Sequence, residues 1–276
     1  MKKIKVKQKV SFLIILIILL LFMVPFFVLV INTFKTTAEF TKTPFSLPKS
    51  LALDNYMVAI ERMNFWKALS NTAIITVLTT LISTVLASMT GYFFARKRWR
   101  INKIIFALFL ASMVAPFQVY MIPLVKIFGG MLGMSNKLSM VVYVAIGLNI
   151  PFSVFLYHGF TEGIPEELDE AAKIDGCNIT RTFFNIIFPL LKPIMITVMV
   201  FVALGAWNDY LMTSLFLTNT ATKTLALAAF TFLTNHTADY SPMMAGLVLG
   251  IIPVLAFYLL GQKYIIEGVI SGSVKG

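Results

Sequence analysis

The feature that most constrains this fold is a run of 20 residues, from Phe12 to Ile31, without a charged side chain. About 20 apolar residues in a helix span the hydrocarbon core of a bilayer. Five lysines precede the run. The run is too long for the apolar part of a secretory signal peptide, and no small-residue cleavage site follows it. We therefore predict an uncleaved first membrane span over about residues 12–32, with Pro25 tolerated as a kink.

Five more apolar stretches follow along the chain. With 58% hydrophobic and 13% charged residues, the composition lies outside the range of water-soluble domains. We predict an all-α integral membrane protein with six transmembrane helices. In the second helix, Ser83, Ala87 and Gly91 recur every four residues, a stripe of small side chains that suits close helix packing. The five later helices are expected over about residues 68–94, 104–128, 138–160, 190–217 and 242–263.

Lysine and arginine predict the orientation of these helices. If both termini face the cytoplasm, 15 of the 23 basic residues lie in cytoplasmic segments and eight in external ones. Because cytoplasmic loops of membrane proteins are enriched in Lys and Arg, the N-in and C-in topology is favoured. It places residues 161–189 in the cytoplasm. The net charge of +11 then reflects topology, and we expect the lipid bilayer, and no nucleic acid, as a partner.

The segment from Ile164 to Pro189 is the most charged part of the chain. Six of the twelve carboxylates lie between residues 162 and 175. Charges are costly inside a bilayer, so this segment faces water. Pro165 suits the first position of a helix, and the acidic residues after it suit the positive end of the helix dipole. Gly176 suits the left-handed position that follows a helix.

These signals predict two helices in the segment. The first covers residues 165–175, with Asp169 and Lys173 placed as an i,i+4 ion pair. The second starts near Asn178 or Thr180 and runs to the end of the segment. Small side chains on one face of the first helix would let another protein surface approach closely.

A fixed pattern runs through both predicted helices. Glu170-Ala171-Ala172 is followed after three residues by Gly176 and, after nine more, by Ile186-x-Phe188-Pro189. The pattern resembles the EAA loop of binding-protein-dependent ABC importer permeases, which usually has Leu at the position of Phe188. The resemblance implies a cytoplasmic coupling helix, between transmembrane helices 4 and 5, that docks in a cleft of an ATPase subunit. The alternative is an ordinary acidic amphipathic helix at a membrane surface. The implied coupling residues are Leu168, Glu170, Ala171, Ala172, Asp175, Gly176, Ile186 and Pro189.

The resemblance extends over nearly the whole chain, to the smaller permease of the maltose-type carbohydrate importers. It includes Trp207-Asn208-Asp209-Tyr210 and the C-terminal residues from Gln262 onward. It implies the type I ABC importer permease fold, with the permease module at about residues 67–263. A basic tail, the first helix and an extracellular loop precede the module over residues 1–66, and a cytoplasmic tail follows over residues 264–276. The tail residues implied to contact the ATPase are Gly272, Lys275 and Gly276.

The same resemblance implies several partners. They are a second, homologous permease, two copies of a cytoplasmic ABC ATPase and an extracellular sugar-binding protein, at the cytoplasmic membrane of a bacterium. The chain itself has no Walker A pattern, no metal-spaced His or Cys, and no nucleophile elbow. We therefore expect no catalytic residue, metal or cofactor in this chain, with ATP and Mg²⁺ held by the partner ATPase.

Helix-breaking and polar residues in the predicted spans mark a candidate translocation path. Broken helices at membrane depth are tolerated where they line a cavity or the protein interior. The side chains of Gln118 and Asn149 can bond sugar hydroxyls, or they can bond neighbouring helices instead. Asp209, the only carboxylate in a predicted span, is either a gate or a helix-pairing residue. The candidate path residues are Pro116, Gln118, Gly147, Asn149, Pro151, Asn208 and Asp209.

A permease of an ABC importer is thus the favoured function, moving a sugar, above all an oligosaccharide, by alternating access. The nearly charge-free spans suit a neutral solute. Related permeases import glycerol phosphates, so glycerol 3-phosphate or another small polar solute is the alternative. An ion-coupled secondary transporter usually places several ionisable residues in its spans, and one carboxylate is too few. A membrane-embedded enzyme would need a catalytic constellation that the sequence does not show.

Overall fold

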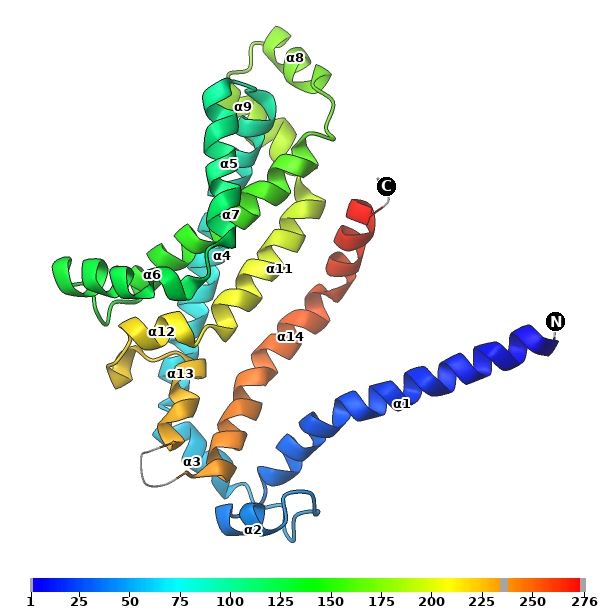
Figure 1. Ribbon diagram of the computed structural model, residues 1–276, viewed down its shortest axis with the longest axis vertical. Helices are drawn as coiled ribbons and strands as arrows, with labels where there is room; N and C mark the ends of the chain where they lie inside the picture. The colour runs from blue at the N-terminus through cyan, green and yellow to red at the C-terminus, as the bar shows by residue number, and fades with distance from the viewer. Residues whose placement is uncertain (1, 234–237, 274–276) are drawn as a thin grey trace. The chain divides into compact units, whose positions relative to one another are not determined.

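The computed structural model describes residues 2–233 and 238–273, and within these ranges it is built of helices (Figure 1). An isolated bridge between Leu233 and Ala238 is the only β-type pairing there. The chain divides into two compact units. The first unit comprises the residues up to 66 together with 228–252, and the second comprises 67–227 together with the residues from 253 on. The predicted all-α class is confirmed.

Four helices are each long and apolar enough to cross a membrane: α1 (Lys2–Asn32), α4 (Phe65–Arg96), α7 (Leu138–Thr161) and α14 (Tyr240–Ser273). Two further pairs of helices pass this test only together, and the pairs are bent by 95° and 80°. The described residues therefore hold four candidate spans, or six if each bent pair is one span. Pro25 lies inside α1, as predicted.

The predicted third span is broken rather than continuous. Helix α5 (Arg100–Val114) ends before Ala115 and Pro116, and α6 (Phe117–Leu124) starts after them and continues as a π-helix, η1 (Val125–Met131). Proline lacks an N–H and disfavours a helical conformation in the residue before it. Ala115 is accordingly extended, with ψ of 118°. The two arms meet at 95°, so Pro116 stands at the break that the sequence indicated.

The predicted fifth and sixth spans also end at other residues than expected. Helix α11 (Lys192–Asn208) stops at Asp209, and the separate helix α12 (Leu211–Phe216) follows. Helix α14 continues to Ser273, so the first ten residues of the predicted tail are helical. The remaining short helices outside the coupling segment are α2 (Thr37–Lys42), α3 (Asp54–Arg62), η3 (Thr220–Thr222), α13 (Leu225–Ala229) and η4 (Phe230–Phe232).

Helix α7 lies at the centre of the second unit, where it contacts both α5 and α11. It also packs closely on α4 at Gly91. A Cβ atom added to Gly91 would lie 2.7 Å from Cβ of Tyr157 and 2.9 Å from the backbone nitrogen of His158. Ser83 and Ala87, on earlier turns of the same helix, are buried. The predicted stripe of small side chains therefore does permit close packing.

Candidate functional site

The segment that the sequence places in water forms helix α8 (Glu167–Ile174). Glu166 is its N-cap residue, and acidic residues in the first turn and Lys173 in the last turn complement the helix dipole. Gly176 has φ of +78°, the left-handed conformation that ends a helix, and its N–H donates to the carbonyl of Lys173 at 3.0 Å. The short helix is confirmed, except that Pro165 precedes the N-cap instead of taking the first helical position.

The predicted second helix is present as three consecutive elements, α9 (Ile179–Thr182), the π-helix η2 (Phe183–Ile187) and α10 (Phe188–Leu190). It starts where expected, because the side-chain oxygen of Asn178 accepts from the N–H of Arg181 at 2.8 Å. This run meets α11 at 80°. Its buried side chains join a core cluster shared with α4, α7 and α11, so the segment is fixed to the membrane-spanning part.

A buried ion pair attaches α8 to the end of α4. Nε of Arg96 donates to Oδ2 of Asp169 at 2.8 Å, and both side chains are only 9% exposed. The hydroxyl of Tyr92 is hydrogen-bonded to the other oxygen of the same carboxylate. The predicted pair of Asp169 with Lys173 is not formed. The planar guanidinium of Arg96 presents several donors in a fixed geometry, which suits a buried carboxylate better than an ammonium group does.

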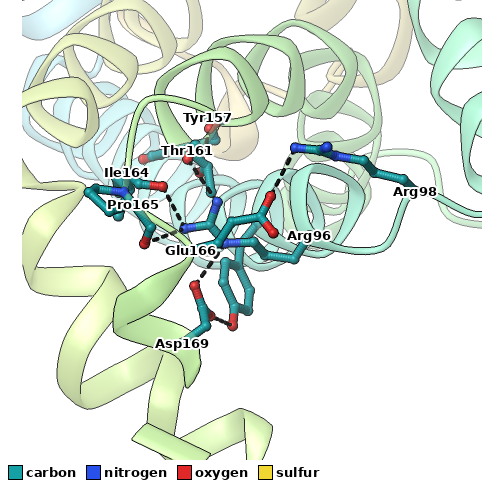
Figure 2. A network of polar contacts seen from close by, with 9 residues as sticks. Arg96, Arg98, Tyr157, Thr161, Ile164, Pro165, Glu166 and Asp169 are labelled. Atoms are coloured by element: carbon teal, nitrogen blue, oxygen red, sulfur yellow. Dashed lines mark hydrogen bonds and ion pairs between the residues drawn. The ribbon is translucent and has the colours of Figure 1, made fainter. Parts of the chain in front are cut away.

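Arg96 also holds the chain that leads from α7 into α8 (Figure 2). Its Nη2 donates to the carbonyl of Ile164 at 2.9 Å and to that of Pro165 at 3.5 Å. Its Nη1 donates to the carbonyl of Thr161 at 3.3 Å. One guanidinium therefore ties together the ends of α4 and α7 and the buried side of α8.

A second ion pair links the same two parts at the surface. Nη2 of Arg98 lies 2.8 Å from Oε1 of Glu166, and the side chains are 70% and 55% exposed. Surface pairs contribute about 1 kcal/mol or less, so the buried pair of Arg96 and Asp169 dominates the attachment. A cavity of about 200 Å³ lies beside the pair of Arg96 and Asp169, and its lining includes Lys173 and Cys177.

The opposite side of α8 points away from these contacts. Asp169 and Ala172 are the buried residues of this helix. With 3.6 residues per turn, the side facing away from them carries Glu167, Ala171 and Ile174. The side chain of Ile174 is 87% exposed. This outward side combines a negative charge with a largely exposed apolar side chain, and it is free to contact another protein.

The residues predicted to couple to an ATPase occupy different environments. Ala172 is buried on the attached side of α8, and Ile186 is half-buried against the core cluster. Both therefore pack within the chain. Pro189 is exposed in α10, away from α8 in the sequence. The remaining predicted residues are exposed on or directly after α8, namely Leu168, Glu170, Ala171, Asp175 and Gly176.

Four residues of this site are missing from the sequence-based set: Tyr92, Arg96, Asp169 and Ile174. Arg96 and Asp169 lie 73 positions apart, so no local pattern links them. In the sequence, the preference of Lys and Arg for cytoplasmic loops already accounts for the basic run around Arg96. A usable signal did exist for Ile174, since it is an apolar residue between Lys173 and Asp175 in a water-facing helix.

The break between α5 and α6 borders a cavity of about 410 Å³. Ala115 and Tyr120 line it from one side, and Gly147 and Pro151 of α7 line it from the other. The structure thus brings together the break at Pro116 and two of the predicted path residues of α7. None of the described residues that line this cavity is charged.

The other predicted path residues have more local roles. Nδ2 of Asn149 donates to the carbonyl of Ala145 at 2.8 Å, within its own helix, and Gln118 is exposed. Nδ2 of Asn208 donates to the carbonyl of Leu204 at 2.9 Å.

Asp209 caps the helix that follows it. Its carboxylate accepts from the N–H of Thr213 at 2.9 Å and from that of Met212 at 3.3 Å, both in α12. Of the predicted tail contacts, Gly272 lies in the last turn of α14. Lys275 and Gly276 lie outside the described residues.

Comparison with known families gives a match over most of the chain. Residues 83–270 match the sequence model of a family described as "Binding-protein-dependent transport system inner membrane component". The "Probable starch degradation products transport system permease protein AmyC" of Thermoanaerobacterium thermosulfurigenes is 41% identical over 275 residues, covering 100% of both chains. The "Melibiose/raffinose/stachyose import permease protein MelC" of Bacillus subtilis is 33% identical over 254 residues, covering 92% of this chain and 91% of its own.

Two solved structures share the fold. A chain of a bacterial ABC transporter involved in the import of the acidic polysaccharide alginate superposes with a TM-score of 0.80 at 20% identity. The alignment covers 94% of this chain and 96% of the other. A chain of the inward-facing MetNI methionine ABC transporter superposes with a TM-score of 0.56 at 14% identity, covering 79% of this chain and 99% of its own.

Proposed function

Because the chain belongs to the family of binding-protein-dependent transport system inner membrane components, we propose that it forms the path by which an ABC importer moves an oligosaccharide inward. As a member of this family it is a membrane permease subunit and no enzyme. It works with an ATPase and a substrate-binding protein.

Two observations support a sugar as the substrate. The relatives AmyC and MelC are named for starch degradation products and for melibiose, raffinose and stachyose. The described residues that line the cavity at the α5–α6 break are all uncharged, which suits a neutral solute with hydroxyl groups better than an anion. Glycerol 3-phosphate, the alternative from the sequence, is therefore not favoured.

The proposed coupling mechanism depends on the attachment of α8 to the ends of α4 and α7. The outward side of α8, with Ile174 at its tip, docks on the ATPase. When the ATPase subunits close on ATP, α8 moves with them. The bonds of Arg96 to Asp169 and to the carbonyl of Ile164 pass this displacement to the ends of α4 and α7.

The movement of α7 is then transmitted to the cavity at the α5–α6 break. Gly147 and Pro151 line it from α7, opposite the α5–α6 break. A shift of α7 against that break changes access to the cavity from either side of the membrane, as alternating access requires. A second, homologous permease would supply the facing half of the path, and two ATPase copies would each receive one coupling helix.

An ion-coupled secondary transporter is the second candidate, and the structure gives it no further support. Asp209 would be its coupling carboxylate, but this side chain caps α12 through two backbone N–H groups.

The test is a pull-down from the native membrane with a tag at the N-terminus. The wild type should bring down a second permease and an ATPase. Glu167→Arg changes an exposed charge on the outward side of α8, and it should lose the ATPase while keeping the second permease. A panel of oligosaccharides, added with the substrate-binding protein, should then stimulate ATP hydrolysis by the wild-type complex. A chain that purifies alone and still moves solute would contradict this function.

A further inference from the structure

A cavity of about 300 Å³ lies where three helix ends of the second unit meet. Lys97 and Arg98, directly after the end of α4, line one part of it. The start of α5 contributes Asn102 and Lys103, and the end of α7 contributes His158. This is the end of the unit that carries α8 and α9 (Figure 1). Neither the transport path nor the docking surface of α8 uses this cavity.

The charges around the cavity do not cancel. Arg98 is paired with Glu166. Glu162 is the one acidic residue among the described lining residues, and its Oε2 lies 3.9 Å from Nδ1 of His158. Among the described residues, Lys97 and Lys103 form no ion pair. Nζ of Lys97 lies 6.0 Å from the centroid of the Trp99 ring, which leaves its charge unneutralised, so both ammonium groups can bind an anion.

The start of α5 adds to this positive potential. The helix begins at Arg100, and no side chain caps its first N–H groups. An uncapped helix start attracts an anion through its free N–H donors and the positive end of the helix dipole. Lining residues Asn102 and Lys103 lie in this first turn. The amide of Asn102 donates to the carbonyl of Lys97 at 2.7 Å, which fixes the two sides of the cavity to each other.

Exposed apolar side chains cover the side of α5 that lies opposite to Asn102 and Lys103. Ile101, Ile104 and Leu108 are exposed on this helix, and Trp99 is exposed just before it. Tryptophan is enriched where a membrane meets water, and apolar side chains on a membrane helix face acyl chains. A phospholipid whose phosphate binds at the start of α5 would place its chains on this side of the helix, whereas a free anion would need no such surface.

We propose that this cavity binds the headgroup phosphate of an anionic phospholipid such as phosphatidylglycerol. The phosphate lies between Lys97, Lys103 and the start of α5, and the acyl chains pass this helix start to the apolar side of α5. Basic pockets between transmembrane helices at the cytoplasmic surface are suited to this class of lipid. The lipid would lie directly beside the Arg98–Glu166 pair at the start of α8, so it also braces the coupling segment.

The test measures lipid binding to the purified complete importer by native mass spectrometry. The probes are phosphatidylglycerol, phosphatidylcholine and inorganic phosphate, each titrated separately. The wild type should bind phosphatidylglycerol about tenfold or more tightly than phosphatidylcholine. The double variant Lys97→Gln with Lys103→Gln should lose this preference, because each cation near a membrane surface contributes substantially to anionic lipid binding.

The matched control is Lys9→Gln with Lys192→Gln, which removes two exposed basic residues that do not line the cavity. It should keep the preference for phosphatidylglycerol. If both double variants bind the lipid alike, the site is not where we place it. If inorganic phosphate binds the wild type as tightly as the lipid and displaces it, the cavity is a free-anion site. Should the double variant fail to assemble, Lys103→Gln alone, at an exposed position, serves in its place.

Discussion

Arg96 and Asp169 lie 73 residues apart in the sequence, yet their side chains form a buried ion pair with a donor–acceptor distance of 2.8 Å. The pair joins the last turn of a membrane-spanning helix to a helix that faces water. Removing one partner would leave the other charge buried without compensation, which costs much more than the pair itself contributes.

The first prediction concerns this pair. Arg96→Gln and Asp169→Asn should each lower the stability of the purified complex, Arg96→Gln by about 3 kcal/mol because Asp169 would remain buried and charged. The double variant Arg96→Met with Asp169→Leu should lose less than the sum of the single changes. Each variant should also transport less sugar per ATP hydrolysed, since α8 is no longer fixed to α4. Thermal unfolding and paired transport and ATPase assays measure the two effects.

Arg98→Gln is the matched control, since it removes an arginine from an exposed pair of equal length. Its effect on stability should stay below about 1 kcal/mol. Equal losses from Arg96→Gln and Arg98→Gln would show that the burial of the first pair has no special role.

A second prediction concerns the tip of α8. Ile174→Asp should leave folding unchanged, because this side chain is 87% exposed, while the ATPase should no longer co-purify. Ile174→Leu keeps an apolar group of the same size and should retain the ATPase. Normal recovery of the ATPase with Ile174→Asp would mean that α8 docks through another side.

The extent of α8 was predictable because its signals are local. Acidic residues at the start, Lys173 near the end and Gly176 beyond it act within a few residues of one another, and the helix follows them. The spans were predictable for a similar reason, since their length and apolar composition are read directly. Pro116 likewise marked a break.

What the sequence could not reveal depends on contacts between distant residues. The local rule pairs Asp169 with Lys173, but burial against α4 selects Arg96 instead. The bend of 95° at Pro116 was not predictable either, because proline only interrupts a helix and the packing of both arms sets the angle. Asp209 was ambiguous for the same reason, and the helix start that it caps became visible only in the structure.

The third prediction concerns the cavity at the α5–α6 break. A Cβ atom added to Gly147 has nothing within 4 Å, so Gly147→Leu should fold and fill part of the cavity. Transport of oligosaccharides should fall strongly while basal ATP hydrolysis persists. Gly159→Leu is the control on the same helix, since it also has open space but does not line the cavity. Equal transport by both variants would remove the cavity from the path.

The last prediction separates an ATP-driven permease from an ion-coupled transporter through Asp209. Asp209→Asn keeps one side-chain oxygen, which can still accept from the N–H of Thr213, the shorter of the two capping bonds. ATP-driven uptake should therefore continue at a similar rate, with an unchanged dependence on external pH. Asp209→Ala loses the cap and should cost about 1 kcal/mol of stability, with a matching fall in the amount of assembled complex. A carboxylate that couples ion flow would remove this difference, because Asn would abolish uptake as completely as Ala. Uptake into vesicles loaded with ATP, measured with and without an imposed proton gradient, distinguishes the two.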